Sequence, residues 1–111
     1  MENLMKRFLF VAALIPALVA CSVPEEDFPE TYGKAMCKQI NKCDKADYES
    51  AYDDDDDCRD DWADVADFIL DAGDLLGQTY SEEKATDCIS ELKKASCDDF
   101  DDGDYECEVF E

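Results

Sequence analysis

Seven cysteines are the feature that most restricts how this 111-residue chain can fold. Cys21 ends an uncharged N-terminal segment. The other six are spread over the rest of the chain: Cys37, Cys43, Cys58, Cys88, Cys97 and Cys107. The sequence has no histidine and no Cys-x-x-Cys pair, so we predict no metal site and no cofactor. An even number of cysteines in an exported chain is typical of structural disulfides, with fifteen connectivities open for six cysteines.

The first 20 residues have the pattern of a secretory signal peptide. Lys6 and Arg7 form a short basic region, and 13 uncharged residues follow, from 8 to 20. This apolar core is too short to remain in a bilayer as a spanning helix, which needs about 20 residues. We therefore predict that the signal peptide is cleaved between Ala20 and Cys21.

Residues 18–21, Leu-Val-Ala-Cys, resemble the bacterial lipobox, in which small residues precede an obligatory cysteine. The resemblance implies that Cys21 is lipidated and becomes the mature N-terminus, held in the membrane by two or more acyl chains. Ser22 follows, and by resemblance to Gram-negative lipoproteins a residue other than Asp there favours the outer membrane. We expect a lipid-anchored protein of the cell envelope, in the outer membrane if the organism is Gram-negative.

Acidic residues dominate the chain after residue 20. This part has eight Lys and Arg and thirty Asp and Glu, so its side-chain charge is −22 at neutral pH. Such a charge excludes nucleic acid as a partner, because binding phosphates requires a basic surface. The charge also repels anionic lipid headgroups, so we expect Cys21 alone to anchor the protein.

The 91 residues that follow the signal peptide are enough for one small domain. Residues 21–30 contain Pro24, Pro29 and an acidic run at 25–27, and we predict an extended, solvated tether of at most about 25 Å. The disulfide-stapled helical domain is predicted to cover residues 31–111.

Apolar periodicity predicts three amphipathic helices, at residues 29–43, 56–76 and 82–95. Pro29 suits a first helical turn, and Ser81 suits an N-cap. The apolar face of the second helix is predicted from spacings of three and four residues: Cys58, Trp62, Val65, Ile69, Ala72 and Leu76. The acidic run at 53–57 precedes this helix, where negative charge is favourable against the helix dipole. We predict a connection at 44–57 and an acidic tail from residue 97.

Three helices with short connections favour an all-α fold, a small three-helix antiparallel bundle stapled by disulfides. Cys37 and Cys43 lie about 240° apart around the first helix and therefore cannot bond to each other. From their heights in the bundle, we predict one pairing among the fifteen: Cys37–Cys88, Cys43–Cys58 and Cys97–Cys107. Each bond is expected to contribute about 2–4 kcal/mol, mainly by restricting the unfolded chain.

Catalysis has little support in the sequence. The absence of histidine excludes Ser–His and Cys–His arrangements, and there is no glycine-rich phosphate loop, so we predict a protein that is not an enzyme, with no catalytic residue. The aromatic side chains at four positions are predicted to be core rather than a ligand cage: Tyr32, Trp62, Phe68 and Tyr80.

Calcium is the remaining ligand that the composition suggests. Residues 98–103 superficially resemble an EF-hand loop, but Phe100 and Val109 stand where ligand oxygens are required. The run at 53–57 also fails, because Cys58 stands where a glycine is needed. Weak association of Ca²⁺ or Mg²⁺ with these clusters remains open.

The cysteine spacing, with Tyr80 before the third helix and Val109-Phe110 near the end, gives the chain a recognisable pattern. The pattern resembles the small cysteine-rich lipoproteins and secreted proteins that are abundant in myxobacteria and related predatory bacteria. The resemblance covers most of the chain after the signal peptide. It implies an exported, cysteine-rich protein and assigns no activity.

The sequence leaves two functions open. The first is a non-enzymatic interaction domain, anchored in the membrane through Cys21, that binds an envelope or extracellular protein. The alternative is an acidic protein that binds Ca²⁺ or Mg²⁺ at the envelope. A shift in melting temperature at sub-millimolar calcium would support the cation-binding alternative, and no shift would contradict it.

Overall fold

The computed structural model describes residues 22–111, so the predicted signal peptide and Cys21 lie outside the described residues. The elements are a 3-10 turn and five α-helices: η1 (Glu25–Asp27), α2 (Phe28–Cys43), α3 (Lys45–Ala51), α4 (Asp55–Leu75), α5 (Glu82–Lys94) and α6 (Cys97–Asp102). The predicted all-α, disulfide-stapled fold is confirmed. No helix in the described part of the chain is long and apolar enough to cross a membrane.

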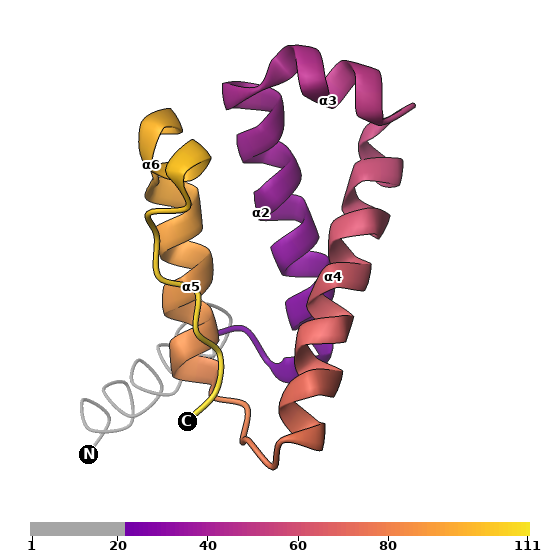
Figure 1. Ribbon diagram of the computed structural model, residues 1–111. Coiled ribbons are helices and arrows are strands. Elements are labelled where there is room, and N and C mark those ends of the chain that lie inside the picture. The colour runs from indigo at the N-terminus through magenta and orange to yellow at the C-terminus, as the bar shows by residue number, and fades with distance from the viewer. Residues whose placement is uncertain (1–21) are drawn as a thin grey trace, which may run out of the picture.

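The three long helices run up, down and up, with α2 between α4 and α5 (Figure 1). Their bounds fall within about one residue of the predicted ones, because local sequence signals fix their ends. The Asp54 carboxylate accepts the Asp57 N–H at the start of α4, and the Ser81 hydroxyl accepts the Lys84 N–H at the start of α5. Pro29 occupies the first turn of α2, where its missing N–H costs no helical hydrogen bond.

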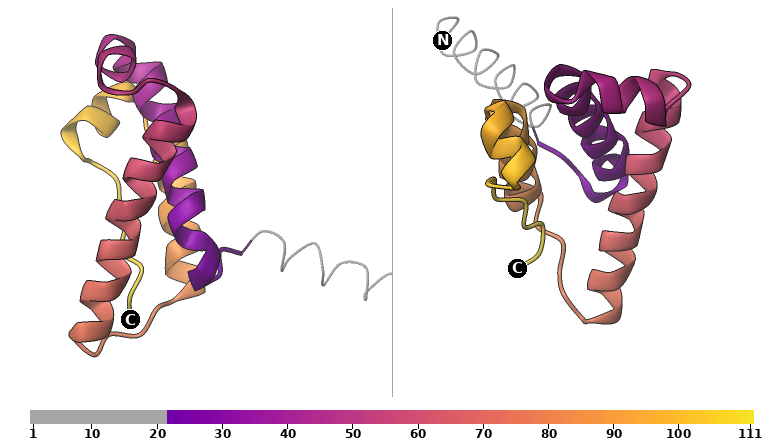
Figure 2. Two further views of the ribbon diagram at one scale, coloured as in Figure 1. Left: turned by 90° about the vertical axis from the view of Figure 1, so that its right-hand side faces the viewer. Right: turned by 45° about the horizontal axis from the view of Figure 1, so that its top comes forward.

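Two short helices lie where the sequence predicted none. Helix α3 occupies the predicted connection at 44–57, and α6 opens the predicted tail. The Ser96 side chain caps α6 by accepting the Asp99 N–H, and Gly103 ends it with a positive φ of 71°. Phe100 is the buried residue of α6, whereas α3 buries none of its side chains. Helices α3 and α6 lie at the same end of the bundle (Figure 2).

Helix α2 provides the centre of the core. Its Phe28 and Met36 side chains are almost fully buried against apolar residues of both neighbouring helices. Those neighbours are Ala66 and Leu70 from α4, and Ala85, Ile89 and Leu92 from α5. The buried Gln39 side chain also joins α2 to α5, because its Nε2 donates to the carbonyl oxygens of Leu92 at 2.6 Å and Ala95 at 3.0 Å.

The predicted apolar face of α4 is wrong in part. Cys58 is buried as predicted, but the buried side of the helix continues through Ala66, Leu70 and Gly73. Val65 is 40% exposed and Leu76 is 76% exposed. The apolar arc of α4 is wider than a single neighbouring helix can cover, and α4 packs mainly against α2.

The predicted extended, solvated tether is wrong for residues 23–28. Val23 and Phe28 are buried, at 7% and 1% exposure, on either side of the η1 turn. The Val23 N–H donates to Thr86 Oγ1 at 3.1 Å, and the Val23 carbonyl accepts the Tyr80 hydroxyl at 2.7 Å. The chain is therefore fixed to the domain from Val23 onward.

The C-terminal segment returns along α5 to the opposite end of the molecule (Figure 1). It pairs with the segment just before α5 through an isolated antiparallel bridge between Tyr80 and Phe110. The Phe110 ring fills the space beside Gly73 of α4, where any side chain would collide with it. This contact links α4 to the α5 side of the molecule.

We predict that Gly33→Ala weakens the crossing of α2 and α4. An added Cβ would lie 2.6 Å from the Arg59 carbonyl oxygen, which belongs to the backbone and cannot rotate away. The expected loss in free energy of unfolding is about 1–3 kcal/mol, measured by urea denaturation. Asn41→Ala, at an exposed position of the same helix, is the matched control and should be near neutral. A Gly33→Ala protein as stable as this control would contradict the packing described.

Candidate functional site

The six predicted cysteines all form disulfides. Cys37 in α2 bonds to Cys58 in the first turn of α4, with the two Cα atoms 6.0 Å apart. Cys43 at the end of α2 bonds to Cys97 of α6, at a Cα distance of 5.2 Å. Cys88 of α5 bonds to Cys107 in the C-terminal segment, at 4.2 Å. Each long helix is thus held by at least one bond.

The predicted pairing of Cys37–Cys88, Cys43–Cys58 and Cys97–Cys107 is wrong. Helix α3 carries the chain across the end of the bundle, and α4 then begins level with Cys37 rather than with Cys43. Cys43 is left facing α6, which the sequence did not predict. Cys107 lies beyond the turn that ends α6, in the segment that runs back along α5, and so meets Cys88.

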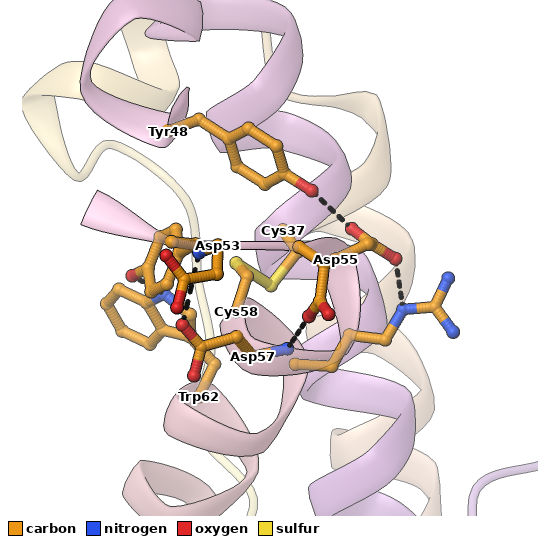
Figure 3. Close-up of a disulfide and its surroundings, with 10 residues drawn as sticks. Cys37, Tyr48, Asp53, Asp55, Asp57, Cys58 and Trp62 are labelled. Atoms are coloured by element: carbon orange, nitrogen blue, oxygen red, sulfur yellow. Dashed lines mark hydrogen bonds and ion pairs between the residues drawn. A yellow bond between two sulfur atoms is a disulfide. The ribbon is translucent and has the colours of Figure 1, made fainter. Parts of the chain in front are cut away.

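The acidic run at 53–57 lies beside the Cys37–Cys58 bond, at the start of α4 (Figure 3). Asp54 caps the helix through the Asp57 N–H at 2.8 Å, and the Asp57 carboxylate accepts the Asp53 N–H at 3.3 Å. Asp55 accepts the Tyr48 hydroxyl at 2.7 Å and forms an ion pair with Arg59 at 2.6 Å. The hydrogen bond to Asp55 raises the pKa of Tyr48. The carboxylates of Asp54, Asp55 and Asp57 therefore each bond to another group of the protein.

Within residues 22–111, no group of three or more acidic or cysteine side chains is placed to hold a metal ion. The divalent-cation hypothesis therefore has no preformed centre in the described part of the chain, and it stays a prediction. One carboxyl pair does interact: a hydrogen bond with Asp44, at the junction of α2 and α3, raises the pKa of Asp101 in α6.

The prediction that four aromatic residues belong to the core is correct for three of them. Tyr32 is buried, while Trp62 and Tyr80 are half-buried and pack against the core. Phe68 is 73% exposed, so its assignment to the core is wrong. Phe68 points instead to the outward side of α4.

That side of α4, together with its C-cap residue, carries four exposed large apolar side chains, which we call the α4 strip. Its members are Val65, Phe68, Leu75 and Leu76, which are 40%, 73%, 88% and 76% exposed. They recur over three helical turns, beside the face that packs against α2. Single exposed apolar residues are ordinary on protein surfaces, whereas several on one side of a helix form a larger apolar surface in contact with water.

The start of the described chain is a second defined feature. Tyr80 donates its hydroxyl to Val23, and its ring packs edge-on against Phe28 with centroids 6.1 Å apart. Burial, followed by the nearby Glu82, Glu25 and Asp27 carboxylates, raises the pKa of Tyr80 to about 12. Only Ser22 separates the fixed Val23 from Cys21.

Comparisons with protein-family models, with curated proteins and with solved structures found no match to this chain.

The buried, neutral Tyr80 hydroxyl, which donates to the Val23 carbonyl, is predicted to stabilise the protein fully below about pH 10 and progressively less above it. The folded state raises the pKa of Tyr80 from 10.0 to about 12, so this stabilisation falls as the pH rises between those values. Tyr80→Phe keeps the ring and should lower the free energy of unfolding by about 1 kcal/mol at neutral pH. Urea denaturation followed by Trp62 fluorescence checks this. The difference between parent and variant should shrink above about pH 10, and a constant difference would contradict it.

Proposed function

We propose that the chain is a lipid-anchored, non-enzymatic protein of the bacterial cell envelope, whose helical domain binds a partner protein through the α4 strip. The anchor part of the proposal is supported by the signal-peptide pattern at residues 1–20 and by Cys21 in its lipobox-like context. The binding part is supported by exposed apolar side chains on an otherwise strongly acidic protein. By this proposal the protein lies in the outer membrane if the organism is Gram-negative.

The exposure of Phe68 and Leu75 is the observation that carries the binding proposal. These side chains lie seven residues, or two helical turns, apart on the same side of α4. Large apolar side chains exposed along a helix lose contact with water when a complementary surface covers them, which favours association.

The charge beside the α4 strip indicates the chemistry of the partner. Asp64 and Asp71 border the strip, and further aspartates occupy the far side of the helix. Arg59 is the only basic residue of α4. A second copy of this chain would bring aspartate against aspartate, whereas an amphipathic helix with Lys or Arg beside its apolar residues would complement both features. The proposed partner is therefore a basic amphipathic segment of another protein.

The anchor is tested by the Cys21→Ser variant. We expect the parent protein in the membrane fraction and the variant either soluble or unprocessed, because the acceptor sulfur for the lipid is missing. Fractionation and intact-mass measurement of the expressed protein give both readouts. A Cys21→Ser protein that is fully matured and still in the membrane fraction would rule out the anchor.

Binding is tested with a synthetic amphipathic helix of Leu and Lys, and with the same residues in a scrambled order. We expect the ordered peptide to bind and the double variant Phe68→Ser/Leu75→Ser to weaken its binding by about tenfold or more. Both side chains are largely exposed, so the fold should be retained. Ala46→Ser/Ala51→Ser, at exposed positions of α3, is the matched control. Equal affinity for the two double variants, or for the two peptides, would show that the α4 strip is not the binding surface.

A further inference from the structure

Basic residues are segregated in this acidic chain. Residues 31–43, which form most of α2, contain Lys34, Lys38 and Lys42 and no Asp or Glu. The part of the chain after residue 20 contains thirty acidic residues and eight basic ones, so a stretch of this length without a carboxylate is conspicuous. The local charge of α2 is therefore opposite in sign to that of the whole molecule.

These lysines line a groove between α2 and α5. They are spaced by four residues, so they lie on one side of α2 about 6 Å apart along the helix axis. Lys34 and Lys38 line a cavity of about 590 Å³ that Lys93 of α5 closes from the other side. An adjoining cavity of about 130 Å³ is lined by Lys38, Lys42 and Lys93 together with Gln39. The two cavities share residues and form one continuous feature, which we call the lysine groove.

The walls of the lysine groove are held in place by buried contacts. Gln39 is 4% exposed and donates to the Leu92 and Ala95 carbonyls, which fixes α2 against the end of α5. The Cys43–Cys97 bond closes the same end of the molecule. The backbone positions of the α2 lysines and of Lys93 on α5 therefore face each other whether or not a ligand is bound.

The ammonium groups of the lysine groove are not used by the fold. Among residues 22–111, none of the four ammonium groups of this groove forms an ion pair or a hydrogen bond, and all four lysines are exposed. Asp27 and Glu30 line the groove at its end near Lys34, and no carboxylate lines the end near Lys42. Like charges kept this close repel one another, and an anion between them would relieve that repulsion.

We propose that the lysine groove binds an extended polyanion that carries phosphate groups. The net negative charge of the protein repels anions at long range, so a single carboxylate would gain too little from one lysine. A ligand with several closely spaced charges meets three or four ammonium groups at once, at distances where the local attraction exceeds the screened repulsion. Lysine binds phosphate as a point charge and needs no fixed fork geometry, which suits exposed side chains on a helix.

The site is independent of the proposed anchor and of the α4 strip. It is formed by α2 and α5 with Asp27 of η1, and none of the residues that line it belongs to α4. The acidic surface as a whole repels phosphate, but the local charge in the lysine groove is positive.

The test is calorimetric titration of the full protein, in an uncharged detergent at low salt, with a short linear inorganic polyphosphate. We expect saturable binding that weakens as salt is added. The double variant Lys38→Gln/Lys42→Gln should bind at least about tenfold more weakly. Lys45→Gln/Lys94→Gln removes the same charge from positions that do not line the groove, and should weaken binding less than about twofold. Circular dichroism verifies that both variants are folded.

Vesicles added as competitors distinguish the sources of phosphate. Competition by phosphatidylglycerol vesicles, but not by phosphatidylcholine vesicles, would support the site with a lipid headgroup as its ligand. Polyphosphate binding without such competition would support a free polyanion. The proposal is overturned by no binding of polyphosphate, or by equal weakening in the two double variants. Self-association of the parent that the groove variant abolishes, with no polyphosphate binding, would show instead that a second copy fills the groove.

Retention of polyphosphate binding by Cys21→Ser and by Phe68→Ser/Leu75→Ser would show that this site stands apart from the proposed function. Failure of the anchor or of the α4 strip would then leave the lysine groove unaffected.

Discussion

The Cys37–Cys58 disulfide fixes the crossing of α2 and α4. Helix α2 of this pair is also the helix against which α5 packs. Gly33 lies at the same crossing and lets the two backbones approach closely. A domain of this size with a side-chain charge of −22 has a small core and strong internal repulsion. Three covalent links, each contributing about 2–4 kcal/mol, oppose that repulsion by restricting the unfolded chain.

Because covalent bonds and one central helix hold the fold, the outer surfaces are free to carry other properties. Helix α4 needs only one of its sides for packing, so Phe68 and Leu75 can face solvent beside aspartates. Helix α2 concentrates lysines on the side toward the groove with α5. One domain thus offers an apolar strip bordered by negative charge and a separate groove lined by positive charge, and these suit partners of different chemistry.

The sequence predicts the three long helices well, because caps such as Ser81 and apolar periodicity act locally. It misses α3 and α6, since short helices depend on tertiary contacts more than on their own pattern. Burial of Val23 depends on residues 57 and 63 positions away, and the disulfide pairing depends on how α3 offsets α4, so neither follows from local spacing. Of the two proposed surfaces, the exposure of Phe68 appears only once α4 is known to have one main packing partner, whereas the lysine spacing in α2 can be read from the sequence.

The pairing of the cysteines tests this account most directly. Protein produced in an oxidising compartment can be digested without reduction, and the linked peptides identified by mass spectrometry. The structure requires three species, joining Cys37 to Cys58, Cys43 to Cys97 and Cys88 to Cys107. A peptide that joins Cys37 to Cys88, or free thiols at Cys37 and Cys58 in the folded protein, would contradict the crossing of α2 and α4 on which this fold depends.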